Sequence, residues 1–288
     1  MREPLVSIVV ACYNGQQFIE YQMLSLASQT YSNLEVIIVD DASSDGGYEY
    51  LEKYVKSYPN YFLVRNSVNL GLVATFEVAI NLARGEYIAL CDQDDIWFPN
   101  KIEQLMANIG NNWLIHSDAN LINETGQIIK SSYFNSCKHH INSYAQYLIE
   151  NNVTGCTALF KRELFSLIGN KFPLGTTVHD RVLAILASKQ DKLIYLNLPL
   201  MSYRQHANNQ VGAISQTSIT VSAQRHLLDL DALTNLDYFN NDVDLYCAQQ
   251  YHNVILKRKP INYKLMVWIQ QKFGWIWLLK YLVKLIIK

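Results

Sequence analysis

The stretch "IALCDQDDIW", residues 88–97, joins an apolar run to a cluster of acidic residues. The apolar part belongs to a strand predicted over residues 86–92, and strands without polar alternation are typical of a sheet covered on both faces. Asp92, Asp94 and Asp95 follow within four positions, and Trp97 comes next. Carboxylates this close repel one another and resist desolvation. The pattern therefore indicates a bound cation at the end of a buried strand.

Three other apolar strands precede this stretch, and each is followed by a predicted helix. The strands are "LVSIVVAC" (5–12), "LEVIIVDD" (34–41) and "YFLVRN" (61–66), and the helices span 16–29, 47–57 and 72–84. Strands that alternate with helices predict βαβ units and a parallel sheet. The polar clusters "YNG", "DDASSD" and "DQDD" all follow strands, at the carboxyl edge where ligands bind in open α/β sheets. We therefore expect these clusters to lie close together.

The second half of the chain mixes strands and helices less regularly. Helices are predicted at about 100–109, 142–150, 161–168 and 178–188, and strands at "WLIHSDANLIN" (113–123) and "KLIYLNLPLMSYRQH" (192–206). Residues 215–256 are largely helical in pattern. We expect an α/β domain that is followed by a helical C-terminal region.

Charge is distributed unevenly along the 288 residues, although the formal net charge is only −1. No acidic residue follows Asp244, so the chain before the tail holds 16 basic residues against 25 acidic ones, a net charge of −9. Eight basic residues come after it: Lys257, Arg258, Lys259, Lys264, Lys272, Lys280, Lys284 and Lys288. A basic tail on an acidic body predicts an anionic partner for the tail. We expect no nucleic-acid partner.

The cysteines and the N-terminus indicate the compartment. The five cysteines form no CxxC pair, which fits a reducing environment. The start, "MREPLVSIVV", lacks the pattern of a signal peptide, and no apolar run reaches the ~20 residues of a spanning helix. We therefore expect a cytoplasmic protein.

Four separated blocks of this sequence resemble a known family. They are "VSIVVACYNG…SLASQTYSNLEVIIVDDASSDGG", "NLGLVATFEVAINLARGEYIALCDQDDIWFPNKI", "VTGCTALFKRELF" and "HDRVLAILASKQDKLIYLNLPLMSYRQHANNQVGA". In this order they resemble the family-2 inverting glycosyltransferases over roughly residues 5–213. The "DQDDIW" and "YRQHxNNxVG" variants are most similar to the bacterial rhamnosyltransferase-type branch, whose donor is dTDP-L-rhamnose.

This resemblance implies the fold and its division. We expect the GT-A fold, a Rossmann-like and mostly parallel sheet flanked by helices, over residues 1–213. The nucleotide-sugar-binding half would be about 1–100 and the acceptor half about 101–213, with a helical extension over 214–288. A UDP-hexose or UDP-N-acetylhexosamine transferase, a nucleotidyltransferase and a non-catalytic sugar-binding scaffold remain as alternatives.

The resemblance also implies a metal and nucleotide site. Asp94 would ligate Mg²⁺ or Mn²⁺, which prefer oxygen ligands, and Asp92 would contact the metal or the ribose. His206 is a candidate third ligand. Tyr13 would lie against the base, and Asp41 would accept the N3–H of uracil or thymine. The alternatives are a solvated acidic turn, helix-capping aspartates and a structural histidine.

Catalysis would rest on a carboxylate at the start of a helix. The resemblance places the general base at Asp180, whose alternative role is that of a first-turn acid favoured by the helix dipole. Many family members carry an arginine for donor phosphates where this chain has "TFE" (75–77), so Arg204 is the candidate replacement. Gly155 belongs to the block on the acceptor side. Trp97 is expected either in the acceptor pocket or in the core.

The tail "GWIWLLKYLVKLIIK" (274–288) has a lysine at every fourth position from Lys280. As a helix it would be about 22 Å long, shorter than the ~30 Å hydrocarbon core. We expect it to lie on the anionic inner face of the plasma membrane, where a lipid-linked or surface-polysaccharide acceptor is assembled. The alternative is packing on the catalytic domain or on a second subunit in a homodimer.

Overall fold

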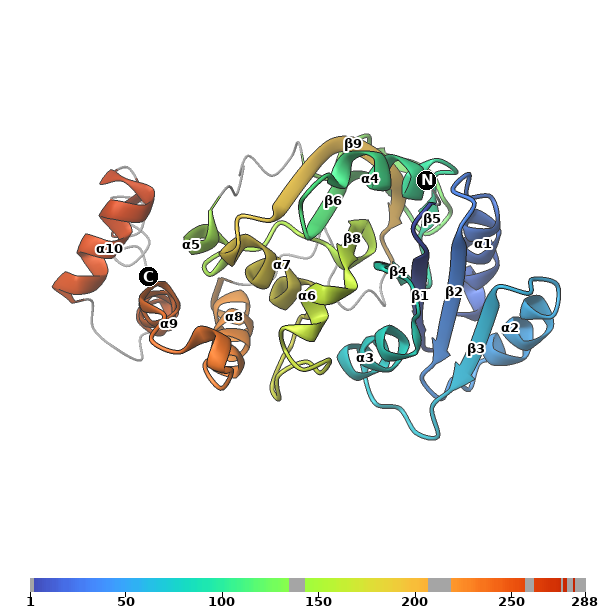
Figure 1. Ribbon diagram of the computed structural model, residues 1–288, viewed down its shortest axis with the longest axis horizontal. Coiled ribbons are helices and arrows are strands. Elements are labelled where there is room, and N and C mark those ends of the chain that lie inside the picture. The colour runs from blue at the N-terminus through green and yellow to red at the C-terminus, as the bar shows by residue number, and fades with distance from the viewer. Residues whose placement is uncertain are drawn as a thin grey trace.

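The computed structural model describes residues 3–134, 143–206, 219–256, 262–275, 277–278 and 282. Within them, nine strands form one sheet, whose main order is β3-β2-β1-β4-β8-β6-β9-β5 (Figure 1). The ninth strand, β7, pairs with β6. The first four strands are β1 (Val6–Cys12), β2 (Leu34–Asp40), β3 (Tyr61–Arg65) and β4 (Tyr87–Asp92). They alternate with α1 (Gln16–Ala27), α2 (Gly47–Val55) and α3 (Leu72–Leu82), which confirms the predicted βαβ pattern.

The register of these parallel strands aligns their polar ends. Cys12 pairs with Asp40 of β2, and Ala11 pairs with Asp92 of β4. The three polar clusters that follow β1, β2 and β4 therefore lie at one edge of the sheet. Their side chains can act on one ligand although 80 residues of sequence separate them.

The strands from the second half of the chain pair in both parallel and antiparallel directions, so the whole sheet is mixed. Strand β8 (Ala158–Lys161) is antiparallel to both β4 and β6 (Leu114–Ile122), while β9 (Leu193–Arg204) is parallel to β6. Two short strands, β5 (Ile96–Trp97) and β7 (Ile128–Lys130), form antiparallel edges. The expected parallel arrangement thus holds for β1–β4 and for β6 with β9. The β5–β9 pair brings the end of β9 back to the acidic cluster.

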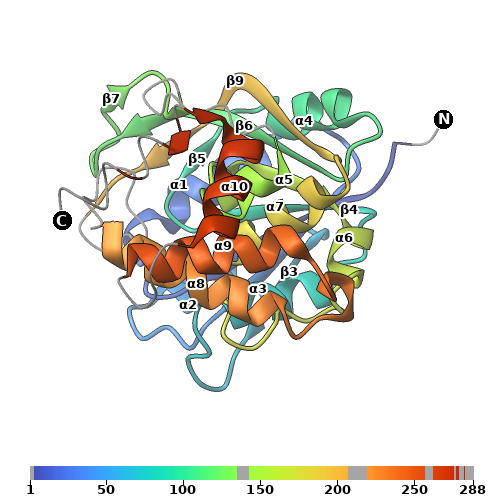
Figure 2. The ribbon, with the colours of Figure 1, turned by 90° about the vertical axis from the view of Figure 1, so that its left-hand side faces the viewer.

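Helices cover the sheet and extend beyond it. They are α4 (Lys101–Ile109), α5 (Tyr144–Tyr147), α6 (Arg162–Ser166), α7 (His179–Lys189), α8 (Ile219–Leu233), α9 (Val243–Ile255) and α10 (Tyr263–Phe273). Helices α8–α10 lie at the end of the molecule opposite β2 and β3 (Figure 1), and they face the viewer in Figure 2. The expected helical C-terminal extension is therefore present.

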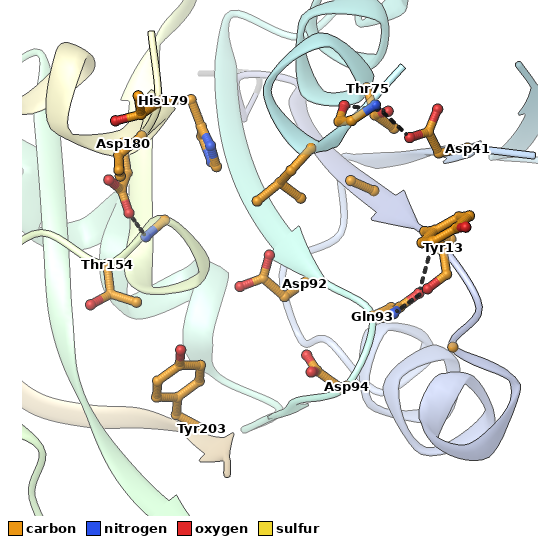
Figure 3. A pocket seen from close by; sticks show the side chains of 18 of the residues that line it. Tyr13, Asp41, Thr75, Asp92, Gln93, Asp94, Thr154, His179, Asp180 and Tyr203 are labelled. Atoms are coloured by element: carbon orange, nitrogen blue, oxygen red, sulfur yellow. Dashed lines mark hydrogen bonds between the residues drawn. The ribbon is translucent and has the colours of Figure 1, made fainter. Parts of the chain in front are cut away.

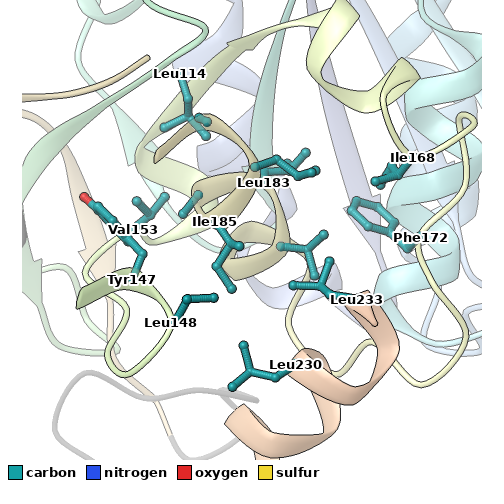
Figure 4. Packing of buried hydrophobic residues seen from close by; sticks show 14 of the residues in the cluster. Leu114, Tyr147, Leu148, Val153, Ile168, Phe172, Leu183, Ile185, Leu230 and Leu233 are labelled. Carbon is teal, nitrogen blue, oxygen red and sulfur yellow. The ribbon is translucent and has the colours of Figure 1, made fainter. Parts of the chain in front are cut away.

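Helix α7 is the centre of the larger hydrophobic core. Its Leu183 and Ile185 are fully buried, and they belong to one cluster with Leu230 and Leu233 of α8 (Figure 4). A continuous core is what makes a domain fold as a unit. The predicted boundary at residue 213 falls in 207–218, outside the described residues, and α8 packs into the same core as α7.

The described part of the tail packs against this core. Leu278 is buried, and Trp277 and Leu282 are partly buried against the cluster, whereas Trp275 is exposed. This packing favours the alternative that the tail lies on the catalytic domain. Lys280, Lys284 and Lys288, the proposed basic stripe, lie outside the described residues. No helix in the described ranges combines the length and apolarity needed to cross a bilayer.

Candidate active site

One cleft opens at the carboxyl edge of β1, β2 and β4. Its volume is about 930 Å³, within the ~300–1,000 Å³ typical of small-molecule sites. Tyr13 and Asp41 lie on one side of it, Asp92 and Asp94 in the middle, and Asp180 on the opposite side (Figure 3). The structure thus brings together sequence-predicted residues from β1, β2, β4 and α7.

The loop that contains Tyr13 is hydrogen-bonded directly to the loop that contains Asp92 and Asp94. The Gln93 side chain accepts the Tyr13 N–H at 2.8 Å and donates to the Tyr13 carbonyl at 2.9 Å. A Cβ at Gly15 would lie 2.2 Å from Gln93 Oε1, so this contact requires glycine. The Tyr13 side chain remains about half exposed and lines the cleft. Gln93, which the sequence analysis did not single out, therefore couples the two loops.

Asp41 is buried at the cleft wall and organises the turn before α3. Its carboxylate accepts the N–H groups of Leu70 and Gly71 and the Asn66 amide, each at 2.8 Å. Burial opposes ionisation, but these three donors outweigh it and hold the Asp41 pKa below its ordinary value. Asp41 is thus an ionised acceptor that faces the cleft. Neighbouring Asp40 instead pairs with Arg65 and accepts the Ser43 N–H, so its role is structural.

Burial and mutual repulsion disfavour the ionised forms of the carboxylates in the acidic cluster. Burial, followed by the charges of Asp94 and Asp180, raises the pKa of Asp92 to about 7. Beneath the cluster, the fully buried Lys101 donates to the Cys156 carbonyl, and its Nζ lies 3.5 Å from the centre of the Trp97 ring. Burial lowers the pKa of Lys101 to about 8. One buried ammonium group therefore offsets part of the acidic charge.

The residues at the cleft floor fit a divalent cation. Asp94 Oδ2 lies 2.7 Å from His206 Nε2, and both residues line the cleft together with Asp92. Carboxylate and imidazole ligands suit Mn²⁺, and carboxylates suit Mg²⁺. The structure therefore brings Asp94 and His206 of the predicted set into direct contact, and Asp92 lines the same cleft.

A second group of potential ligands lies deeper. Ligand atoms of Asp92, Asp95 and Cys156 all lie within 4.8 Å of one another. However, Asp95 is buried and accepts the Arg204 N–H at 3.0 Å, and burial raises the pKa of the Cys156 thiol well above its usual range. A protonated thiol is a poor metal ligand. The deeper group therefore fits a divalent cation less well than the carboxylates that line the cleft.

Asp180 is the carboxylate on the far side of the cleft. Its Oδ2 accepts the Gly155 N–H at 2.7 Å, and its Oδ1 lies 3.4 Å from the Asn151 amide nitrogen. Burial raises the pKa of Asp180 to about 7, and hydrogen bonds from the backbone N–H groups of Gly155 and Arg181 only partly oppose the rise. A base poised near neutrality suits proton abstraction at physiological pH. Gly155, expected on the acceptor side, thus supports Asp180 directly.

Two predicted residues lie elsewhere. Arg204 is buried and is absent from the cleft lining; its guanidinium donates to the carbonyls of Asp94, Asn123 and Glu124. In these contacts the guanidinium of Arg204 binds backbone carbonyls outside the cleft lining, whereas the sequence predicted a contact with donor phosphates. Trp97 is 2% exposed and packs in the core, which was one of its two expected roles.

Helix α8 contributes cleft residues that no sequence motif marked. Ser222, Arg225 and His226 lie three and four positions apart and all line the cleft. Arg225 is partly buried, so it brings a basic side chain to the cleft. Only the helical spacing could have suggested that they share a face.

The family assignment follows from the matched residues. The model of glycosyl transferase family 2 matches residues 7–169, more than half of the chain. The chain belongs to glycosyl transferase family 2. The matched residues include β1, β2 and β4 with the polar loops that follow them, whereas Asp180 and α8 lie beyond the match.

Two curated relatives are similar to this family-2 glycosyltransferase over more than 70% of its length. EpsH of Bacillus subtilis is 33% identical over 223 residues, which cover 73% of this chain but only 64% of EpsH. The dTDP-rhamnosyl transferase RfbG of Shigella flexneri is 32% identical over 222 residues, or 71% of this chain and 74% of RfbG.

Two solved structures show the same GT-A fold. Staphylococcus aureus TarS (residues 1–349) in complex with UDP-GlcNAc superposes with a TM-score of 0.65 at 17% identity, covering 98% of this chain and 88% of TarS. The mannosyltransferase PcManGT from Pyrobaculum calidifontis, in complex with GDP-Man and Mn²⁺, gives 0.60 at 15% identity, covering 99% and 88%. At these identities the likeness establishes the fold.

Proposed function

We propose that this family-2 glycosyltransferase transfers L-rhamnose from dTDP-L-rhamnose, with inversion, to a surface-polysaccharide or lipid-linked acceptor. One observation carries the proposed chemistry: Asp180 lies across a single cleft from Asp92 and Asp94 (Figure 3). A base on one side and a cation-binding pair on the other are what a direct displacement at a sugar carbon needs. The similarity to RfbG supports rhamnose as the sugar.

The reaction is a single displacement. Asp180 removes the proton from an acceptor hydroxyl as its oxygen attacks the anomeric carbon. The bond between that carbon and the diphosphate oxygen breaks, and the electron pair leaves with the nucleoside diphosphate. Attack from the side opposite the leaving group inverts the anomeric configuration. The proton stays on Asp180 until solvent takes it.

Asp92, Asp94 and His206 would hold Mg²⁺ or Mn²⁺ beside the diphosphate. The bound cation supplies positive charge that stabilises the departing diphosphate. On the nucleotide side, Tyr13 offers an aromatic face for the base, and ionised Asp41 can accept the N3–H that thymine and uracil share. The same contacts would therefore admit a UDP-hexose or UDP-N-acetylhexosamine donor, the runner-up.

Other functional classes fit the site less well. A nucleotidyltransferase needs a basic, glycine-rich loop over a triphosphate, and the loop after β1, "YNGQQ", is neither. A sugar-binding scaffold would not need Asp180, whose pKa is raised to about 7 in the cleft.

A donor screen tests the proposal. The enzyme is incubated with Mn²⁺ and each of dTDP-L-rhamnose, UDP-galactose, UDP-glucose and UDP-GlcNAc, and released nucleoside diphosphate is measured. We expect the largest metal-dependent release from dTDP-L-rhamnose. Selective release from a UDP-sugar would replace the rhamnose assignment. No release and no thermal protection by any donor would overturn the glycosyl-transfer assignment.

We also propose that the enzyme works at the cytoplasmic face of the plasma membrane, where its basic tail meets anionic lipid. The charge of the tail supports this, and the burial of Leu278 supports the opposing alternative of packing on the protein. Deleting residues 274–288 should release the enzyme from phosphatidylglycerol vesicles at low salt and preserve donor hydrolysis. If the intact chain ignores such vesicles, or if truncation instead dissociates a homodimer, membrane binding is wrong.

A further inference from the structure

Asp229 of α8 is fully buried and holds the backbone just before Asp180. Its Oδ1 accepts the Thr177 N–H at 2.6 Å, the Thr177 hydroxyl at 2.9 Å and the Val178 N–H at 3.3 Å. Val178 occupies the N-cap position of α7 and provides no side-chain cap. Asp229 therefore supplies, from another helix, a carboxylate that fixes the entry into α7.

The other oxygen of Asp229 secures the residue just after Asp180. Asp229 Oδ2 lies 3.4 Å from Arg181 NH1, and both side chains are almost completely buried. The Arg181 guanidinium also donates to the carbonyls of His226 and Leu148, each at 2.9 Å. A buried ion pair is very sensitive to the loss of one partner, because the other charge is then left uncompensated. Asp229 thus contacts the chain on both sides of Asp180.

We infer that Asp229 is a positioning residue: through Thr177, Val178 and Arg181 it aims the Asp180 carboxylate into the cleft. This inference rests on the proposed role of Asp180 as the base. It gives α8 a part in catalysis, although α8 lies beyond the residues that match the family model. On this inference, the Asp180 carboxylate is correctly placed only when α8 is packed on α7.

The charge of Asp229 affects the pKa of Asp180, and the pH dependence of the rate reports that pKa. A purely structural role of Asp229 would leave this pH dependence unchanged. The titratable groups that face it are Arg181 on its own helix, Asp229 from α8 and Asp92 from β4, and burial lowers the pKa of His179 beside it to about 4. The Asp229 charge raises the pKa of Asp180, and the Arg181 charge lowers it. Removing the negative charge at Asp229 should therefore lower the Asp180 pKa and let the base stay ionised at lower pH.

The test compares Asp229→Asn with Asp231→Asn, a matched loss of charge at an exposed position of the same helix. Turnover and donor KM are measured with Mn²⁺ and dTDP-L-rhamnose, or with the UDP-sugar that replaces it in the screen. We expect Asp229→Asn to lower kcat about 10- to 100-fold, as misplaced catalytic groups do. Donor KM should change little, and the acidic limb of the kcat/KM profile should move to lower pH. Asp231→Asn should behave as the wild type.

Thr177→Val keeps the inference testable if Asp229→Asn does not fold. It removes only the hydroxyl contact to Asp229, at an exposed position, and should lower kcat with an unchanged melting temperature. Folded variants with normal kcat and an unmoved acidic limb would overturn the inference. If Asp180→Asn itself keeps normal turnover, the proposed role of Asp180 as the base fails first; if only Asp180→Asn is inactive, the role of Asp229 alone is wrong.

Discussion

Replacing Asp180 with asparagine should lower turnover about 10²- to 10⁴-fold, the usual contribution of general-base catalysis. The amide preserves the shape of the side chain and can still accept the Gly155 N–H, but it cannot take the proton of the acceptor. Donor binding should stay close to normal, because Asp41, Asp92 and Asp94 are untouched. The loss should therefore fall on kcat and not on donor affinity, measured by single-turnover kinetics and by titration with the nucleoside diphosphate.

The pH profile gives this variant an internal check. In the wild type, Asp180 must be ionised, so the rate should fall as the pH drops through the raised pKa of about 7. In Asp180→Asn the residual rate should lack this limb, because the titrating group is gone. Asp231→Asn, on the exposed side of α8, serves as the control for the loss of one negative charge. Near-normal turnover in Asp180→Asn would move the base to another residue.

The first half of the sheet, β1–β4, could be predicted from the sequence for a physical reason. Strands buried on both faces must be apolar throughout, so β1, β2 and β4 are visible as continuous hydrophobic runs. Their polar ends then meet at one edge because the strands are parallel. Tyr13, Asp41, Asp92 and Asp94 could thus be placed in one cleft without coordinates.

The second half of the sheet, β5–β9, was less predictable because its strand pairing is irregular. Strand β8 is only four residues long and runs directly into α6, so its apolar residues carry no distinct period. Strand β5 has two residues, too few for any pattern. Sequence periodicity also says nothing about which strands are neighbours, so the mixed order around β6, β8 and β9 could not be anticipated.

Arg204 and Asp229 show the same limit at the level of side chains. The sequence indicates that an arginine follows the last long strand, but not that the carbonyls of Asp94, Asn123 and Glu124 engage its guanidinium. Asp229 lies in an ordinary helical pattern, 49 positions after Asp180. Its contacts arise from the packing of α8 on α7, which only the folded structure defines.

Replacing Asp94 with alanine should abolish metal-dependent transfer. Asp94 is the cleft carboxylate that also contacts His206, at 2.7 Å, so its loss would remove both a proposed oxygen ligand and this contact to the imidazole. Without the cation, the diphosphate would have to enter a cleft lined by three remaining aspartates, Asp41, Asp92 and Asp180. Their negative charge would repel it, because close like charges in a partly buried site are poorly screened. Donor affinity and turnover should therefore fall together, which distinguishes this variant from Asp180→Asn.

Two measurements separate a lost cation from a damaged fold. Mn²⁺ with dTDP should raise the melting temperature of the wild type, since a ligand at 100 times its Kd stabilises by about 2.7 kcal/mol; Asp94→Ala should lose this increase and keep its melting temperature without ligand. His206→Ala should lose only part of the increase, because both aspartates remain. Asp231→Ala controls for the change in charge and should retain the full effect. Undiminished transfer by Asp94→Ala, or by the wild type in excess EDTA, would show that the acidic cluster has some role other than holding a cation.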